Sequence, residues 1–362
     1  MIILIYQQLS HPVLVGSNHL KSSYSSIHYQ RLYSSHFNST ISSLIFELCH
    51  VGVCTLDTVD RDIILELFKN CRISYEDLGQ KTGLTSSSVW RRVSLLLESG
   101  VIERFVTQLS AEVVKSDPVI TFVSTNGEEN ENELVEAIFK HPMVVSISPV
   151  INRFCLVISE IVEEDDLESQ RKHITSIDGV SSVEMHIADT DPSWDLKFGI
   201  MDKFTQAQMK VLRCLTKEAR MSLTDLASCT GFTHKKVNML MGEIIESGGI
   251  WFTLRGNLNA GDDLSILLKI RFDGKELTVD ELRSWLSQEF PDAYWWTYIS
   301  LSEQVIFTTF VFKHINEIAH ISKKVQEHIG VISTEPFFDL PARKRPRLRT
   351  RRLEEMLTKA GF

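Results

Sequence analysis

The sequence predicts an α+β fold in which two winged helix-turn-helix domains alternate with two ferredoxin-like βαββαβ domains. Three observations support this prediction. The chain has 362 residues, enough for two to four domains. Residues 57–102 align without a gap with residues 205–250, and 14 of the 46 pairs are identical. Two further segments, 118–190 and 263–340, each show the order strand, helix, strand, strand, helix, strand.

Each copy of the repeat predicts three helices. The first helix of the leading copy covers about 58–70. The second helix begins after a capping serine, Ser74 or Ser222, because a serine hydroxyl suits the unpaired amides of a helix start. It ends at Gly83 or Gly231, where glycine can adopt a left-handed turn. Two short helices joined by such a turn are typical of a helix-turn-helix.

The third helix of each copy has a predicted buried stripe at helical spacing. Thr85 and Thr233 are its predicted N-caps. A β-rich run follows each helix, at 101–109 and 250–258, and each run suits a wing hairpin. The predicted stripe residues are Val89, Val93, Leu96 and Leu97 in the first copy, and Val237, Met241, Ile244 and Ile245 in the second.

The two α/β segments contain similar predicted elements. Predicted strands lie at 119–124, 143–149, 153–161 and 180–188, and at 264–272, 293–300, 304–312 and 331–338. Predicted helices lie at 132–140, 164–176, 279–290 and 315–328. Pro192 and Pro341 mark plausible domain ends. The predicted parts are an N-terminal extension 1–55, winged helix-turn-helix domains 56–112 and 200–260, ferredoxin-like domains 116–192 and 262–340, and a C-terminal tail 341–362.

The two ends of the chain differ in composition from the rest. Residues 1–55 are rich in Ser, Tyr and His, have Glu47 as their single acidic residue, and show no periodicity. They predict a disordered extension, with a start codon placed too early as the alternative. Residues 343–352 hold seven basic residues in ten. This tail predicts a disordered arm that follows a phosphate backbone or enters a minor groove, with a solubilising or partner-binding tail as the alternative.

Composition restricts the function classes. Hydrophobic content of 43% and charged content of 23% are typical of soluble globular proteins. A net charge of −9 argues against nucleic acid as a partner, but the basic tail shows that the charge is unevenly distributed. No apolar run is long enough for a membrane span, and a cytoplasmic protein with six reduced cysteines is expected. No Cys/His cluster, phosphate-binding loop or catalytic constellation predicts a metal, a cofactor or catalysis.

Several motifs of the first copy resemble one family. Leu56-Asp57, Arg72-x-Ser74, Gly83-Leu84-Thr85, Val89-x-x-Arg92-Val93 and Glu98-Ser99-Gly100 are similar to the leucine-responsive regulator (Lrp/AsnC, feast/famine) family. The resemblance implies a winged helix-turn-helix that binds double-stranded DNA, followed by an α/β ligand and oligomerisation domain. The tandem two-copy chain resembles archaeal-type relatives. It implies a transcriptional regulator that forms an intramolecular pseudo-dimer or a homo-oligomer.

One turn departs from the family pattern. Members that bind amino acids carry a glycine-containing turn between the second and third strands of the α/β domain. Here the turns read Ile151-Asn152-Arg153-Phe154 and Leu301-Ser302-Glu303-Gln304, without glycine. Amino-acid or other small-molecule sensing therefore stays open.

The N-terminal part and solvent face of a recognition helix enter the major groove. Arg91 lies opposite the buried stripe, and its guanidinium fits the two acceptors of guanine. The two copies differ at these DNA-facing positions, which predicts an asymmetric operator. For any single candidate residue, the alternative is that it lies on an ordinary solvated helix face without a DNA contact. The candidate DNA-binding residues are Ser86, Ser87, Ser88, Trp90, Arg91 and Arg92 in the first copy, His234, Lys235, Lys236 and Asn238 in the second, and Arg343, Lys344, Arg345, Arg347 and Arg349 in the tail.

Two other functions stay open. Tandem proteins of similar build act as sirohaem decarboxylases. Their His/Arg-rich stretch is replaced here by Pro149-Val150-Ile151-Asn152-Arg153-Phe154-Cys155, and its counterpart in the second copy lacks His and Arg. A structural adaptor that has lost DNA binding is the third hypothesis. On a predicted strand, Trp295 and Trp296 point to opposite faces, so one enters the core and the other lines an interface or a small-molecule pocket.

Overall fold

The computed structural model describes residues 55–127, 130–150, 154–189, 199, 203–338 and 342–362. All of the described helices and strands belong to one compact unit, residues 53–362. The prediction for residues 1–55 therefore lies outside the described residues, apart from residue 55. The same holds for Pro192, Pro341 and the turn at 151–153.

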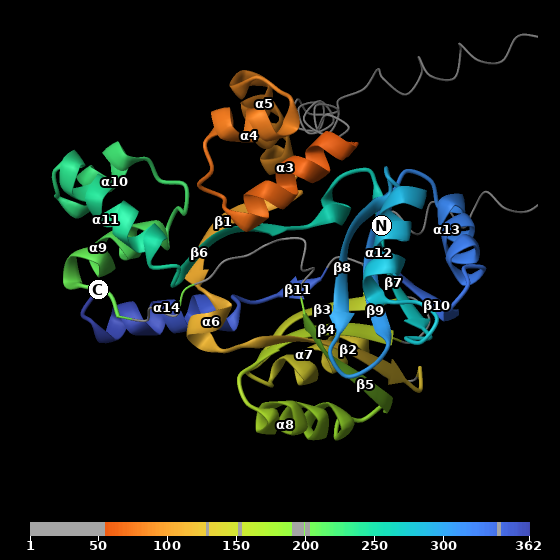
Figure 1. The fold of residues 1–362 in the computed structure, drawn as a ribbon. Coiled ribbons are helices and arrows are strands. Elements are labelled where there is room, and N and C mark those ends of the chain that lie inside the picture. The colour runs from red at the N-terminus through yellow and green to blue at the C-terminus, as the bar shows by residue number, and fades with distance from the viewer. Residues whose placement is uncertain (1–54, 128–129, 151–153, 190–198, 200–202, 339–341) are drawn as a thin grey trace, which may run out of the picture. The chain divides into compact units, whose positions relative to one another are not determined.

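Two sets of three helices occupy the repeat, each followed by one strand (Figure 1). Their second helices begin and end as predicted: Ser74 and Ser222 accept hydrogen bonds from amides three residues on, and Gly83 and Gly231 have φ of 72° and 68°. The first set is α3 (Thr58–Lys69), α4 (Tyr75–Thr82), α5 (Ser86–Glu98) and β1 (Ile102–Leu109). The second is α9 (Gln206–Leu215), α10 (Leu223–Thr230), α11 (His234–Glu246) and β6 (Ile250–Gly256).

The strands β1 and β6 pair with each other, so the prediction of a separate wing hairpin in each copy is wrong. They form a two-stranded antiparallel ribbon in which Arg104 lies opposite Arg255 and Val106 opposite Thr253. Each copy supplies one strand, and a single strand leaves a row of unpaired backbone groups. Pairing with the strand of the other copy satisfies those groups.

A nine-stranded antiparallel sheet contains the α/β segments, with strand order β10-β7-β9-β8-β5-β2-β4-β3-β11. The two sets of four strands are joined where Ala188 and Asp189 of β5 pair with β8. A short helix, α6 (Ala111–Val114), precedes the first set. That set is β2 (Asp117–Thr125), α7 (Glu131–Phe139), β3 (Val144–Val150), β4 (Phe154–Ile161), α8 (Glu164–Thr175) and β5 (Val180–Asp189). The second is β7 (Leu264–Phe272), α12 (Val279–Glu289), β8 (Tyr294–Ser300), β9 (Val305–Phe312), α13 (Asn316–Gln326) and β10 (Val331–Phe338).

Alternating side chains of these strands enter different cores. Val123 packs beneath α7 and α8, whereas its neighbour Phe122 faces the other way. Phe122 stacks on Phe307 of β9 at 5.7 Å between ring centroids and contacts Phe337 of β10 at 4.4 Å. The sheet faces that the helices leave uncovered therefore pack against each other. Trp295 is buried against the first helical set, as expected for one tryptophan of the pair.

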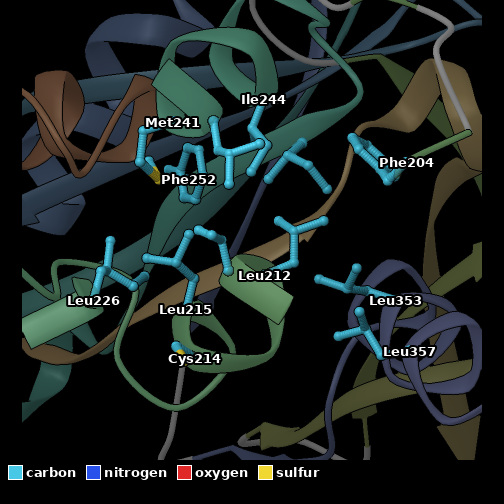
Figure 2. Close-up of a cluster of buried hydrophobic side chains, with 14 of the residues drawn as sticks. Phe204, Leu212, Cys214, Leu215, Leu226, Met241, Ile244, Phe252, Leu353 and Leu357 are labelled. Atoms are coloured by element: carbon cyan, nitrogen blue, oxygen red, sulfur yellow. The ribbon is translucent and has the colours of Figure 1, made fainter. Parts of the chain in front are cut away.

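The C-terminal segment is folded, so the prediction of a disordered arm is wrong. Residues Arg343–Lys344 form β11, paired with β3, and Leu348–Lys359 form α14. Leu353 and Leu357 of α14 are fully buried in one core with residues of α9, α10 and α11 (Figure 2). The arginine-rich composition of this segment led the sequence analysis to overlook these leucines, whose spacing of four places them on one helix face.

Two smaller predictions also fail. Leu97 and Ile245 are 39% and 51% exposed, because each lies eight residues after Val89 or Val237 and is therefore rotated by about 80° from that residue, at the edge of the buried stripe. The expectation of six reduced cysteines is wrong for Cys214 and Cys229, which form a disulfide between α9 and α10. The packing of these helices brings their Cα atoms to 6.4 Å.

Candidate nucleic-acid interface

Helix α5 is fixed to α3 by an ion-pair network. Asp57 and Asp60 form a reciprocal capping box at the start of α3. Arg92 donates to Asp57 at 2.9 Å and to Asp60 at 2.8 Å. Burial raises the pKa of Asp60, whereas for Asp57 the hydrogen bonds from the Asp60 amide and Arg92 outweigh burial and lower the pKa. Arg92, one of the candidate DNA-binding residues, therefore holds the helix in place.

The other candidates on α5 present polar groups to solvent. Thr85 caps the helix, and its hydroxyl lies 3.1 Å from that of Ser87 and 2.9 Å from that of Ser88. Ser86, Ser87 and Arg91 are exposed, Ser88 is half-buried, and Trp90 is 60% exposed. Among the described residues Arg91 has no ion-pair or hydrogen-bond partner. This face therefore offers a free guanidinium and short hydroxyl donors beside a helix N-terminus.

Helix α11 presents a different, more basic surface than α5. His234, Lys235, Lys236 and Asn238 are all exposed, as the sequence suggested. The Lys236 ammonium lies 4.1 Å from the centre of the Phe232 ring. The position equivalent to Arg91 is Met239, which is 54% exposed.

A different contact replaces the Arg92 network in this copy. The Gln208 amide donates to Glu243 at 2.9 Å and joins α9 to α11. Both third helices are thus anchored to their first helix, by different side chains.

Two arginines lock the helical sets together reciprocally. Arg72 donates to the carbonyl oxygens of Ala219 (2.6 Å) and Met221 (3.1 Å). Arg220 donates to those of Cys71 and Ile73, the latter at 3.3 Å. Each residue number in one exchange differs by 148 from its counterpart in the other, which is the offset of the sequence repeat. Reciprocal contacts between equivalent residues are the property of a two-fold interface.

The ribbon obeys the same pseudo-two-fold relation. Thr107 pairs with Phe252, and Arg104 with Arg255, so that each pair maps onto the other when 148 is added or subtracted. The sequence shows Arg72 and Arg220 as an identical pair but does not indicate their role. An arginine present in both copies, outside the third helix, was the available signal.

The basic residues of the tail contact carboxylates and carbonyl groups of the chain itself. Arg343 pairs with Glu136, and Lys344 with Glu103 at 2.7 Å. Arg345 donates to backbone carbonyl oxygens at the end of α7. These three side chains attach the C-terminal segment to α7, to the residues that follow it and to the ribbon.

Arg347 and Arg349 share one buried carboxylate. Glu160, 1% exposed in its side chain, accepts from Arg347 at 3.0 Å, from Arg349 at 3.1 Å and from the Leu348 amide at 2.8 Å. Burial raises the pKa of Glu160, but the two guanidinium groups outweigh that effect and lower it. A role for the tail in DNA binding, as the sequence suggested, would require these contacts to be given up.

Comparison with known proteins identifies the class of the first helical set. Residues 56–103 match the model of a family described as winged helix-turn-helix DNA-binding. The chain therefore contains a DNA-binding winged helix-turn-helix there, as predicted from the sequence.

Relatives that match part of the chain are named as transcriptional regulators. An HTH-type transcriptional regulator of Pyrococcus abyssi is 29% identical over 134 residues, which cover 36% of this chain and 90% of the relative. An HTH-type transcriptional regulator of Mycobacterium tuberculosis is 42% identical over 52 residues, covering 14% of this chain and 35% of the relative. These similarities support a DNA-binding transcription regulator.

A solved structure resembles the fold over most of the chain. The siroheme decarboxylase NirDL, in complex with an iron-uroporphyrin III analogue, has a TM-score of 0.50 and 10% identity. The similarity covers 84% of this chain and 100% of that chain, and at this identity it concerns the fold. Across the described residues, no helix combines the length and the apolar composition needed to cross a membrane. In the same part of the chain, no group of His, Cys, Asp and Glu side chains is suited to hold a metal ion.

Proposed function

We propose that this protein is a sequence-specific transcriptional regulator that reads double-stranded DNA with two non-identical recognition helices, α5 and α11. The observation that carries the proposal is the winged helix-turn-helix at residues 56–103, whose recognition helix exposes Arg91 without a partner among the described residues. An arginine fork fits the O6 and N7 acceptors of guanine in the major groove. Arg91 is the residue that reads sequence, and the adjacent serines contact phosphate.

The second helical set is proposed to be a degenerate copy of the first. Its support is the reciprocal exchange of Arg72 and Arg220 and the pseudo-two-fold register of the ribbon. One chain then supplies the two helices that ordinary dimeric regulators obtain from two chains. Because α11 has Lys235 and Lys236 but no equivalent of Arg91, the second half contributes affinity more than specificity, and the operator is asymmetric. The two α/β segments, 116–192 and 262–340, are proposed to be ferredoxin-like domains that serve assembly and small-molecule sensing.

Selection of duplexes from a random pool tests the proposal, followed by affinity measurements at two salt concentrations. An asymmetric motif and weaker binding at high salt are expected, because phosphate contacts release counterions. Arg91→Ala is expected to relax the motif by about 1–3 kcal/mol of discrimination. The double change Lys235→Ala/Lys236→Ala is expected to weaken binding to all sequences and to lower the salt dependence.

A matched control removes two exposed lysines elsewhere. Lys172 of α8 and Lys323 of α13 have side chains that are 75% and 76% exposed, and their double change to alanine leaves DNA affinity unchanged. If no duplex binds even at low salt, the regulator proposal fails. A tetrapyrrole-binding enzyme then becomes the leading candidate, because a siroheme decarboxylase shares the fold over 84% of the chain.

A further inference from the structure

A cavity of about 290 Å³ lies between the β1–β6 ribbon and the nine-stranded sheet. Its walls come from α3, both strands of the ribbon, both halves of the sheet and the C-terminal segment. Several apolar wall residues also belong to the core between the two sheet faces: Ile120, Leu156, Ile158, Leu267 and Tyr298. The cavity therefore continues an apolar core, and its size falls near the lower limit for pockets that hold small organic ligands.

The charge of the cavity wall is one-sided. Five of its lining residues are basic, and none is Asp or Glu, although the whole chain has 47 acidic and 38 basic residues. The basic residues are Arg104, Arg255, Lys344, Arg345 and Arg347. Cavities lined by one sign of charge concentrate ligands of the opposite sign.

Carboxylates outside the cavity neutralise only part of this charge. Glu103 pairs with both Arg255 (3.0 Å) and Lys344 (2.7 Å). Glu160 pairs with Arg347, but the same carboxylate also serves Arg349, which lies outside the cavity lining. The carboxylates of Glu103 and Glu160 are thus outnumbered by the five basic side chains that line the cavity.

Arg104 stands out among the basic lining residues. It is exposed and has no partner among the described residues. It lies directly opposite Arg255 in the ribbon, and like charges at opposite positions of a sheet repel. Burial is the largest cause that lowers the pKa of Arg255, and the charges of Arg104 and Arg347 lower it further. An anion between these arginines would relieve the repulsion.

We propose that this cavity binds an apolar organic acid, with its aliphatic or aromatic body against the sheet and its carboxylate at Arg104 and Arg255. The body would occupy the space beside Ile158 and Leu267, and Trp251 and Trp296 supply aromatic surface. Ile64, Leu65 and Phe68 of α3 also line the cavity, so the ligand contacts the DNA-binding unit directly. The proposal goes beyond DNA binding and does not depend on it.

Calorimetric titration of the full-length protein, without DNA, tests the proposal. The probes are octanoate, 4-phenylbutyrate and indole-3-acetate, each compared with its uncharged amide. At least one acid is expected to bind at a single site, with its amide at least about tenfold weaker, since one charge-assisted contact contributes about 1.5–3 kcal/mol. Failure of every acid to bind below about 1 mM, or equal binding of acid and amide, overturns the proposal.

Three variants locate the binding. Arg104→Gln is expected to weaken binding of the acid at least about tenfold and to leave the affinity for the amide unchanged. Ile158→Trp, which fills the cavity, is expected to abolish binding of both. Arg91→Ala is the matched control: it alters DNA recognition and leaves acid affinity unchanged.

The variants also separate the two proposals. Thermal unfolding of each variant shows whether it is folded. If the Ile158→Trp protein is unfolded, the result for Arg104→Gln decides the test. An Arg104→Gln protein that binds the acid as tightly as the wild type contradicts the assignment. Acid binding that persists when no duplex binds would leave the cavity proposal standing and overturn only the regulator.

Discussion

Several buried or half-buried charges in this protein are paired with side chains distant in the sequence. The carboxylate of Glu184 of β5 lies 2.5 Å from the ammonium nitrogen of Lys269 of β7 and 3.0 Å from Nε2 of His186. Arg271 lies 3.7 Å from the same carboxylate. Because β5 and β7 belong to different sets of strands, this cluster is one of the polar contacts that join the two halves of the sheet. The sequence offers no means of pairing residues 85 positions apart.

The Glu184 cluster predicts a pH dependence of stability. The hydrogen bond from His186 and, against the effect of burial, the interaction with Lys269 lower the pKa of Glu184 to about 2. A pKa below the ordinary value of 4.5 means that the stabilisation is complete above pH 4.5 and is lost as the pH falls toward 2. Glu184→Gln is therefore expected to be less stable than the wild type at pH 7, by about 1 kcal/mol since the carboxylate is 40% exposed.

Urea unfolding at a series of pH values measures the difference in the free energy of unfolding between the wild type and Glu184→Gln. This difference should become smaller as the pH falls from 4.5 to 2. Glu327→Gln, at the exposed C-cap of α13, controls for the loss of one negative charge. A difference that stays constant over this pH range contradicts the prediction.

Helix boundaries in both helical sets are determined by local sequence. Ser222 accepts from the Asp225 amide at 3.1 Å, and the chain leaves α10 at Gly231 in a left-handed conformation. These contacts join residues close in the sequence, so the pattern of caps and glycines was sufficient to predict them. The wing strands show the opposite case, because nothing local in 101–109 determines which strand it pairs with.

Replacing the N-cap serine of α10 and a serine within the helix by alanine is expected to have different effects on stability. Ser222→Ala removes the N-cap and is expected to destabilise the second helical set by about 1 kcal/mol. Ser228→Ala changes an exposed serine within the same helix, whose hydroxyl binds the Thr224 carbonyl oxygen. Alanine is the better helix former there, so the effect is neutral or stabilising by a few tenths of a kcal/mol. Hydrogen exchange of the α9–α11 amides measures both; equal effects would show that the cap contributes nothing.

The C-terminal segment connects parts of the molecule that lie far apart in the sequence. Its β11 extends the sheet at β3, its arginines bind Glu160 of β4, and α14 completes the core of the second helical set. One segment of about twenty residues therefore connects the second helical set to the first half of the sheet.

This arrangement predicts that α14 stabilises the second helical set. The double change Leu353→Ala/Leu357→Ala is expected to cost several kcal/mol, because each fully buried leucine contributes about 2–5 kcal/mol. The loss of protection from hydrogen exchange should be concentrated in α9–α11 and α14. Leu301→Ala, at a position 61% exposed, is the control and should have no effect. Uniform loss of protection over the whole chain, or none, would contradict the role assigned to α14.

The sequence by itself determined the repeat, most helices and strands, the helix caps and the exposed faces of α5 and α11. These features follow from periodicities and hydrogen bonds within a few residues, which composition and spacing reveal. Only the tertiary structure decided how the copies combine: β1 with β6, Arg72 with Ala219, Glu160 with Arg349 and Cys214 with Cys229. Such contacts depend on the spatial position of whole elements. Seven arginines and lysines in ten residues indicate a solvated arm until the fold brings carboxylates, carbonyl groups and an apolar core to meet them.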